Sequence, residues 1–589
     1  MEQNHLYNIR HSLSHLLAMA VLEQFPEAKL AIGPPVDNGF YYDFDLPRSL
    51  TPDDLPILEK SMIKLVNQKV AFTSRKESIA AAEEILKDQP YKLELLKDLA
   101  AKGETEVGFY TSGTFTDMCK GPHVASTAEI LPKSFRLSHT AGAYWKGSEK
   151  NQMLQRIYGL AFETAEELNQ YDAMMAEAKK RDHRVLGPQL GIYMLSEEVG
   201  SGFPLWMPRG ETIKYLLQEY MRKKEQARGY QYVSTPAIAN EKLYQRSGHA
   251  TYYADDMFKF TDSEGVSFYI KPMNCPHHHM IYEKLALSYR DLPIKLAEAG
   301  GIYRHERSGT LSGLIRVRGA ITQNDSHIYV TPAQLKAEFL DVLSLFKGVY
   351  SEVGIKDYWF RLSLPDFGSE KGKYGGDQQK WEDASNAIRE ALQEFGTPFV
   401  EALGEAAFYG PKLDVQVKNV TGKEDTIATS QVDILVPERM GLKYTDEHGQ
   451  EQVPIVIHRA ILGSYERFTA FLIEQTAGNF PFWLAPIQVA ILPVSDQCLA
   501  VAKDLSKALM AAGYRVEVDA STESVGKKIR GASIQKIPLK LVVGEQEAES
   551  MAAGWSLKPN WRTDLQETMG EEALSLQQLI EKMAPINHA

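Results

Sequence analysis

Residues 316–330, RVRGAITQNDSHIYV, contain two strand-like runs, and this stretch decides the fold of the middle of the chain. Similar runs lie on both sides of it: VSFYIK at 266–271, KLDVQVKNV at 412–420 and VPIVIH at 453–458. These runs do not alternate regularly with helices, as the strands of a parallel nucleotide-binding sheet would. The sequence therefore predicts a mainly antiparallel sheet within residues 188–485.

The segments on either side of this region have different patterns. Residues 1–145 alternate helical stretches with turn-rich strand-like pieces, which indicates an α+β domain. A polar helical run at 164–187 ends in Gly187-Pro188 and predicts a connecting helix with a stop signal inside residues 146–187. Residues 486–589 alternate strand and helix, as a small doubly wound α/β domain does.

Composition excludes several classes of protein. A chain of 589 residues with 44% hydrophobic and 24% charged residues suits roughly three to five globular domains. The net charge of −12 argues against a protein that coats nucleic acid through a wholly basic surface, although Lys527, Lys528, Arg530, Lys536 and Lys540 could form a local basic patch or a solvated helix face. Three cysteines, and the lack of a signal peptide or membrane span, predict a cytoplasmic protein without disulfides and without a membrane partner.

Phosphate-binding candidates are arginines rather than a glycine-rich loop. The segment GSEKGKYGG at 368–376 lacks the spacing of a phosphate-binding loop and predicts a mobile loop. Arg304 in YRHERSG, Arg316 in LIRVRG and Arg467 in GSYERF fall on or beside strand-like runs. A guanidinium stays charged and holds two phosphate oxygens at once, so the three together indicate phosphate binding, although each alone would be an ordinary structural arginine.

Cysteine and histidine pairs add weaker signals. His11 and His15 are four residues apart, which places them on one face of a helix, and Cys119 and His123 have the same spacing. Either pair alone is more often incidental. Cys275 by itself is typical of a small buried apolar residue.

Five motifs together resemble the bacterial-type threonyl-tRNA synthetases, which are class II aminoacyl-tRNA synthetases. They are KPMNCPHH at 271–278, AEAGGIYRHERSG at 297–309, RVRGAITQNDSHIY at 316–329, EAAFYGPKLDV at 405–415 and VIHRAILGSYERF at 456–468. The resemblance implies an α+β multidomain enzyme: an editing domain at 1–145, a connecting helix at 146–187, an antiparallel-sheet catalytic domain at 188–485 and an anticodon-binding α/β domain at 486–589. It implies that L-threonine is activated with ATP and Mg²⁺ and transferred to tRNA(Thr), in a homodimer whose interface includes the helix at 214–236.

The resemblance also implies roles for residues of the catalytic domain. ATP would be held by Arg304, Glu306, Arg316, Lys412 and Arg467. One Zn²⁺ per chain would be held by Cys275, His327 and His458, leaving a position for the amine and hydroxyl of threonine. The other positions around the amino acid would be Gln323, Asp325, Tyr409, Gln431 and Ser464.

Serine keeps both coordinating groups of threonine and lacks only a methyl, which a pocket discriminates by about 1–3 kcal/mol. Hydrolytic editing of Ser-tRNA(Thr) is therefore expected. The resemblance implies that it uses His11, His15, Lys92, Asp117, Cys119 and His123, by a water mechanism for which no metal is assigned. The alternative that His11, His15, Cys119 and His123 hold a metal ion stays open. In the anticodon-binding domain it implies tRNA contacts by Lys528, Arg530 and Glu547.

The sequence departs from the family pattern in four places. The editing motifs begin almost at Met1, so we expect the small ubiquitin-like domain that usually precedes them to be missing. The stretch DASTESVGKKIR at 519–530 lacks the Arg-Asn-Glu-Lys sequence that is common after the aspartate. One extra residue precedes Gln323 and predicts a bulge or a flipped register in that strand, and His277 replaces a usual glycine. Two alternatives remain open: a class II ligase for another amino acid, such as proline or serine, and an RNA-binding regulator that has lost catalysis.

Overall fold

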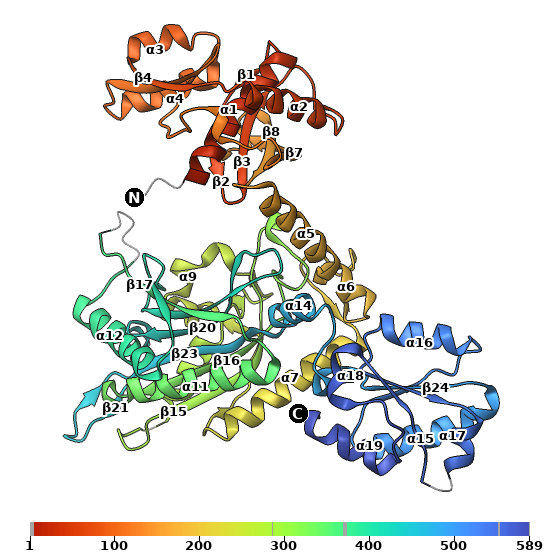
Figure 1. Ribbon diagram of the computed structural model, residues 1–589. Helices are drawn as coiled ribbons and strands as arrows, with labels where there is room; N and C mark the ends of the chain where they lie inside the picture. The colour runs from red at the N-terminus through yellow and green to blue at the C-terminus, as the bar shows by residue number, and fades with distance from the viewer. Residues whose placement is uncertain (1–4, 286, 369–373, 552–553, 588–589) are drawn as a thin grey trace. The chain divides into compact units, whose positions relative to one another are not determined.

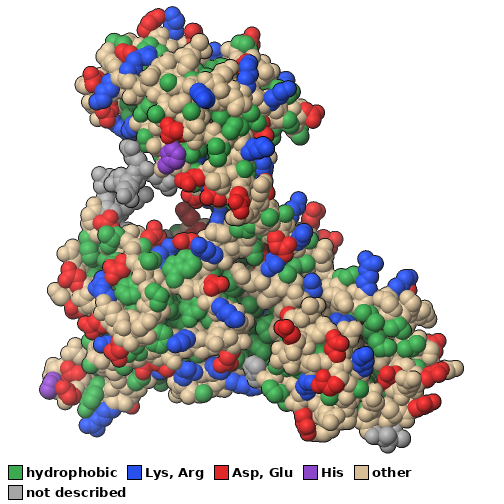
Figure 2. Space-filling model, viewed as in Figure 1, with side chains coloured by type: hydrophobic (Ala, Val, Ile, Leu, Met, Phe, Trp, Pro, Cys, Tyr) green, Lys and Arg blue, Asp and Glu red, His purple; other side chains and the backbone are tan. Residues whose placement is uncertain are grey.

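The computed structural model describes residues 5–285, 287–368, 374–551 and 554–587 (Figure 1). Residues 369–373, most of the predicted loop at 368–376, lie outside this description. The chain forms two compact units, Met1–Ala176 and Glu177–Ala589. In the part of the chain that is described, no helix is long and apolar enough to cross a membrane. The face drawn in Figure 2 carries basic and acidic side chains interspersed, as the net charge suggested.

The first unit is built on an antiparallel sheet with a buried helix against it. The sheet has the order β1-β3-β8-β7, with β2 paired to β3. Helix α1 is buried on nearly all sides, including its polar residues Ser12, Ser14 and His15, so it sits in the core rather than on the surface. The elements are α1 (His5–Gln24), β1 (Lys29–Leu30), β2 (Pro35–Val36), β3 (Gly39–Asp45), α2 (Asp54–Asn67), β7 (Phe135–Tyr144) and β8 (Met153–Ala161).

A second, smaller sheet in this unit has the order β4-β5-β6 and is also antiparallel. Its apolar residues Val107 and Phe109 pack with Ala82, Leu86 and Leu96 from two helices. The elements are β4 (Phe72–Ser78), α3 (Ile79–Ile85), α4 (Pro90–Ala101), β5 (Glu106–Ser112) and β6 (Phe115–Met118).

The helical run predicted at 164–187 is present but divided in two. Strand β8 pairs with β3 and β7, and the helix begins after it, at Ala165. The two parts are α5 (Ala165–Arg181) and α6 (His183–Gln189), which are separate because Asp182 leaves the helical conformation and its side chain accepts from the Arg184 backbone N–H. Helix α6 ends at Gln189, one residue beyond the predicted stop at Gly187-Pro188.

The second unit contains an eight-stranded sheet of order β11-β15-β16-β23-β20-β19-β17-β18. Only the pairs β11/β15 and β17/β18 are parallel, which confirms the predicted, mainly antiparallel sheet. The strands are β11 (Gln231–Tyr232), β15 (Ile294–Ile302), β16 (Ile321–Val330), β17 (Tyr358–Leu364), β18 (Phe399–Leu403), β19 (Lys412–Lys418), β20 (Glu424–Asp433) and β23 (Ile455–Ser464).

Helices cover the apolar face of this sheet (Figure 1). Strand periodicity sets the two faces: Ile328 and Val330 of β16 enter the core, while Gln323, Asp325 and His327 point to the other face. The helices are α7 (Pro208–Gln226), α11 (Leu335–Val353), α12 (Gln378–Phe395) and α14 (Tyr465–Thr476).

Shorter elements complete this region. They are β9 (Tyr193–Met194), β10 (Leu205–Trp206), β12 (Ile238–Asn240), α8 (Glu241–Arg246), α9 (His249–Tyr252), β13 (Lys259–Thr261), β14 (Ser267–Ile270), α10 (Cys275–Glu283), α13 (Val436–Arg439), β21 (Tyr444–Thr445) and β22 (Glu451–Gln452).

The carboxy-terminal part forms a four-stranded sheet of order β25-β24-β26-β27. Strand β24 is buried on both faces: Val489 and Ile491 enter one apolar cluster, while Ala490 and Leu492 enter another that includes Ala532 of α16. The strands are β24 (Val489–Pro493), β25 (Val516–Val518), β26 (Leu539–Val543) and β27 (Pro559–Trp561), and the helices are α15 (Leu499–Ala511), α16 (Val525–Ile534), α17 (Glu545–Ser550), α18 (Thr563–Met569) and α19 (Leu576–Met583). The predicted α/β layering is therefore present.

Candidate functional site

Two adjoining cavities open on the polar face of the eight-stranded sheet. The larger has a volume of about 630 Å³ and is lined mainly by residues of β16, β19, β20 and β23. The smaller, about 340 Å³, is lined by residues that include Glu306 and Arg316. Tyr253, Met273 and Arg304 line both cavities, so Arg304 stands where the two meet.

Cys275, His327 and His458 converge in the larger cavity. Cys275 is the first residue of α10, and His327 and His458 lie directly opposite each other on β16 and β23. One ligand atom from each lies within 4.8 Å of the others, and His327 Nε2 is 3.0 Å from His458 Nδ1. A thiol and two imidazoles are a donor set that zinc prefers, and three protein ligands leave one position open.

The surroundings of these ligands fit a metal ion. His458 Nε2 lies 3.0 Å from a carboxylate oxygen of Asp433, which only accepts, so the ring proton is on Nε2 and the Nδ1 lone pair faces the cluster. Burial, reinforced by His458, lowers the pKa of His327 well below its ordinary value, which keeps that imidazole neutral as a ligand must be.

Two residues of this centre escaped the sequence analysis. Asp433 follows Gln431 by two positions in β20, and this strand spacing is the signal that would have placed both on one face. His249 Nε2 lies 3.5 Å from Cys275 Sγ, and no spacing in the sequence connects those two residues.

Polar side chains line the rest of the larger cavity. Asn274 Nδ2 donates to Asp325 Oδ2 at 2.9 Å, and the Tyr409 hydroxyl donates to Gln431 Oε1. Gln323, Asp325, Tyr409 and Gln431 all line the cavity. The structure thus gathers four of the five predicted amino-acid contacts around the metal-ligand candidates.

The fifth, Ser464, has a different position. It ends β23 and is the N-cap of α14, where its Oγ accepts from the Arg467 backbone N–H at 3.2 Å. It pairs with Gln323 across the sheet but does not line either cavity among the described residues.

The extra residue before Gln323 does not distort β16 in the way predicted. Pairing between β15 and β16 is regular from Ile294↔Tyr329 to Ile302↔Ile321, and β16 starts only at Ile321, so RVRG is not part of the strand. The register shift lies against β23, where the span from Ala460 to Ser464 faces the shorter span from Gln323 to Asp325. The surplus residues are therefore on β23, and the exposed Ala320 stays outside the strand.

Three of the five predicted ATP residues, Arg304, Glu306 and Arg316, line the smaller cavity. Arg304 and Glu306 follow β15, and Arg316 Nε lies 3.5 Å from Glu306 Oε2. Lys412, which lines the larger cavity, has its amino group 3.0 Å from Asp414. Arg467, in the first turn of α14, is largely buried, and burial lowers the pKa of its guanidinium. Arg467 does not line either cavity among the described residues.

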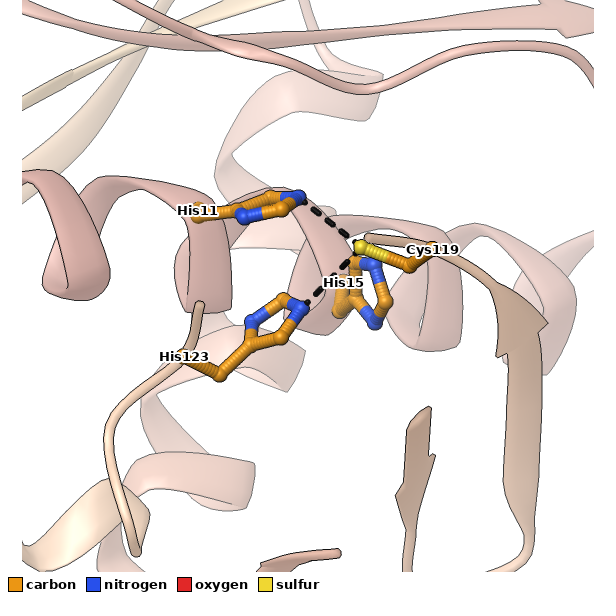
Figure 3. A group of neighbouring side chains, drawn as sticks. All are labelled: His11, His15, Cys119 and His123. Carbon is orange, nitrogen blue, oxygen red and sulfur yellow. Dashed lines mark hydrogen bonds between the residues drawn. The ribbon is translucent and has the colours of Figure 1, made fainter. Parts of the chain in front are cut away.

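A second cluster lies in the amino-terminal unit (Figure 3). His11 and His15 come from successive turns of α1, and Cys119 and His123 come from the irregular segment after β6. Cys119 Sγ is 3.2 Å from His11 Nε2 and 3.4 Å from His123 Nε2, and the four ligand-type atoms lie within 4.8 Å of one another. Burial lowers the pKa of His11, His15 and His123, so all three imidazoles are neutral near pH 7.

A buried charged pair supports this cluster from one side. Lys92 Nζ lies 2.7 Å from Asp117 Oδ1, and His15 Nε2 lies 3.9 Å from Asp117 Oδ2. The Tyr42 hydroxyl donates to Asp117 Oδ2 at 2.7 Å. Tyr42 was not predicted as a site residue, because a tyrosine in an apolar strand gives no signal of function. All six predicted editing residues are thus brought together.

The predicted tRNA contacts of the carboxy-terminal part have unequal access to solvent. Lys528 is buried and donates to the carbonyls of Pro493 and Asp519 at 3.0 and 3.1 Å, whereas Arg530 is exposed. Glu547 Oε2 accepts from the Gly544 N–H at 2.9 Å. Since Lys540 is buried as well, the basic residues of this region do not form one exposed patch.

Comparison with known proteins gives three family matches. Residues 258–476 match the tRNA synthetase class II core domain (G, H, P, S and T), and residues 488–584 match the anticodon binding domain. Residues 107–158 match the threonyl and alanyl tRNA synthetase second additional domain. Fold, cavities and matches define a class II aminoacyl-tRNA synthetase.

Full-length relatives narrow this class. The chain is 48% identical to the threonine–tRNA ligase of Geobacillus sp. (strain WCH70), over 92% of this chain and 83% of the relative. It is 49% identical to that of Gloeobacter violaceus, over 92% of this chain and 87% of the relative. The chain belongs to the threonine–tRNA ligase family, and it joins threonine to tRNA with ATP as the energy source.

Solved structures agree with this family. The RNA binding domain of threonyl-tRNA synthetase from Cryptosporidium parvum Iowa II superimposes with a TM-score of 0.64 at 34% identity, covering 69% of this chain and 99% of that one. A putative threonyl-tRNA synthetase from Aeropyrum pernix gives 0.59 at 31% identity, covering 69% of this chain and 94% of that one. The second additional domain is consistent with editing.

Proposed function

We propose that the two cavities bind threonine and ATP side by side and join them as threonyl-adenylate. The observation that carries this proposal is the position of Arg304 between the cavity of the metal-ligand candidates and the cavity of Glu306 and Arg316. In the reaction the threonine carboxylate attacks the α-phosphorus and pyrophosphate leaves. Guanidinium groups suit this step, because it develops negative charge and needs little proton transfer.

Within this proposal each residue has a role. Arg304 clamps the α-phosphate and Glu306 contacts adenine, while Arg316, Lys412 and Arg467 hold the remaining phosphates. Mg²⁺, if bound with ATP, would supply positive charge beside the phosphates that these side chains hold. Asp325 accepts a hydrogen bond from the substrate amine, and Gln323, Tyr409, Gln431 and Ser464 hold the amino acid or the strands that carry it.

We propose Zn²⁺ as the metal of Cys275, His327 and His458, at one ion per chain. Bound there, zinc supplies a Lewis-acidic position that accepts an amine and a β-hydroxyl together. The donor set and the outward hydrogen bond of His458 support this choice. Valine has the shape of threonine but lacks the hydroxyl, so it would leave the position incomplete.

The direct test measures amino-acid-dependent ATP–pyrophosphate exchange together with zinc content. We expect exchange with threonine, exchange with valine lower by at least about 100-fold, and one zinc per chain. Proline- or serine-dependent exchange that exceeds exchange with threonine would contradict the proposal. A chain that binds tRNA but shows no exchange would favour the regulatory alternative.

The remaining assignments follow the same family. We propose that residues 1–145 hydrolyse mischarged Ser-tRNA(Thr) and that residues 146–187 connect them to the catalytic domain. We propose that residues 188–485 activate threonine. Residues 486–589 bind the anticodon of tRNA(Thr), and Lys528, Arg530 and Glu547 contact the tRNA. We also propose a homodimer formed through the region of α7, where Tyr215 is 57% exposed.

We propose that the histidine and cysteine cluster of the first unit hydrolyses Ser-tRNA(Thr). Burial lowers the pKa of His11, so its imidazole is neutral near pH 7 and has a nitrogen lone pair free to take a proton from water. The Lys92–Asp117 pair offers a fixed charge beside them, which can hold the substrate amine or the ribose. The chemistry needs only an oriented water and a proton acceptor.

The change His11→Ala tests this site. We expect charging with threonine to be unchanged and deacylation of Ser-tRNA(Thr) to fall by about 100-fold or more, the contribution of a general base. The measurement is deacylation of preformed Ser-tRNA(Thr). His139→Ala, an exposed histidine on β7 of the same unit, is the control and should deacylate normally. Normal deacylation by His11→Ala would remove the editing assignment.

A further inference from the structure

A chain of buried polar side chains stands behind the metal-ligand candidate His327, and the proposed reaction makes no use of it. His327 Nδ1 lies 2.8 Å from His278 Nδ1, and His278 Nε2 lies 3.2 Å from Glu298 Oε2. His278 is completely buried and Glu298 is nearly so. Burying a carboxylate and two imidazoles in contact is unfavourable unless each hydrogen bond is made, so the positions of the protons can be deduced.

The proton positions follow from Glu298. A carboxylate only accepts, so the His278 proton is on Nε2 and its Nδ1 carries a lone pair. His327 must then donate from its own Nδ1, and its Nε2 lone pair points away from His278, toward His458. Glu298, at the outer end of this series of hydrogen bonds, thus decides which nitrogen of His327 faces His458.

With these proton positions, two nitrogen lone pairs face each other, and a bound cation would remove their repulsion. Asp433 holds the His458 proton on Nε2, so the lone pair of His458 Nδ1 faces the lone pair of His327 Nε2 across 3.0 Å. Two acceptors at that distance repel each other unless a positive ion bonds to both. Both carboxylates therefore prepare the same pair of nitrogens for a metal.

Glu298 is itself held by donors on its other side. Its Oε1 accepts from the Thr235 backbone N–H at 2.8 Å and lies 3.4 Å from Lys271 Nζ. Burial would raise the pKa of Glu298, but the bonds from His278 and Thr235 and the charge of Lys271 outweigh it and lower the pKa to about 2. The group is ionised at every pH at which the enzyme works.

We propose that Glu298 is a positioning residue that acts through His278 to present Nε2 of His327 to the metal, and so sets the affinity of the site for zinc. This inference rests on the proposed metal centre of Cys275, His327 and His458. Behind His458 stands one carboxylate, that of Asp433. Behind His327 stands a relay of two residues, first the imidazole of His278 and then the carboxylate of Glu298.

The change Glu298→Gln tests the relay. A carboxylate accepts hydrogen bonds at both oxygens, whereas the amide of glutamine accepts only at its oxygen and donates from its nitrogen. The donors Thr235 N–H and Lys271 retain the amide oxygen, so the amide nitrogen must face His278 and donate to it. His278 would then carry its proton on Nδ1 and donate to His327, which would place the His327 proton on Nε2, where the metal must bind. We expect zinc affinity to fall by about 10- to 100-fold.

The measurement is the zinc dissociation constant of the full chain by competition with a chromophoric chelator. Glu474→Gln is the matched control, since Glu474 accepts from His183 Nδ1 at 2.7 Å in a separate buried pair, and its zinc affinity should equal that of the wild type. Unchanged zinc affinity in Glu298→Gln would overturn the relay.

A second pair of variants decides the question if Glu298→Gln does not fold, as judged by circular dichroism. His278→Asn keeps an oxygen near the position of Nδ1 and should retain most of the zinc affinity, whereas His278→Phe removes the acceptor and should lose it. Equal affinities in those two variants would also overturn the relay. Wild-type chain without zinc, or Cys275→Ala with full zinc, would instead reject the metal centre itself.

Discussion

Replacing Arg304 with alanine should lower threonine-dependent ATP–pyrophosphate exchange by about 100- to 1,000-fold, the usual effect of removing one group that stabilises developing charge. Arg304 lines both cavities, which places it in the proposed reaction where the carboxylate of threonine would meet the α-phosphate of ATP. Arg304→Lys keeps the charge without the planar fork and should recover only part of the rate. Binding of tRNA should be unaffected.

The control for this prediction is Arg389→Ala. Arg389 lies on α12, pairs with Glu401 at 2.7 Å and lines neither cavity among the described residues. Its loss should leave exchange within about twofold, because an exposed ion pair contributes little to stability. If Arg304→Ala exchanged as fast as Arg389→Ala, the assignment of the junction as the reaction centre would be wrong.

Replacing Cys275 with alanine should remove zinc and abolish threonine activation together. Loss of a group behind a ligand typically weakens metal binding by about 10- to 100-fold, so loss of the ligand itself should exceed that range. We expect less than about one-tenth of a zinc per chain after dialysis, and exchange lower by more than about 100-fold. Zinc content is measured by mass spectrometry on the same sample that is assayed.

Cys498→Ala is the matched control, since it replaces a buried cysteine in the apolar cluster of the carboxy-terminal sheet. It should lower the free energy of unfolding slightly through lost packing and leave zinc and exchange intact. Full zinc in Cys275→Ala would exclude the thiol as a ligand. Full exchange without zinc would separate the metal from substrate selection.

The two pairs of residues with a spacing of four illustrate how far spacing can be trusted. His11 and His15 do share a helix face, because α1 is a regular helix through both. Cys119 and His123 lie outside any helix, in an irregular segment where Gly121 adopts a φ of +66°, so their approach comes from the path of that segment. The same spacing therefore produced the same proximity by two different physical routes.

The extra residue near Gln323 shows the opposite case. Local sequence predicted a distortion in β16, yet the strand pairs regularly with β15 and the irregular span lies on β23. A strand begins where its backbone finds partners, and β16 finds them only from Ile321. Ala320 is accommodated before that point.

The sequence by itself determined the fold class and, through five motifs, the family, and it singled out the arginines for which we propose phosphate binding. These depend on short-range patterns: the period of two in strands such as β16, and residue types fixed by the chemistry they perform. Residue spacing did not connect Cys275, His327 and His458, which only the family resemblance grouped, and tertiary structure alone decided that Glu298, His278 and Asp433 stand behind them. Strand pairing joins β16 to β23 across more than a hundred residues of chain, and no local pattern records which side chains such pairing brings into contact.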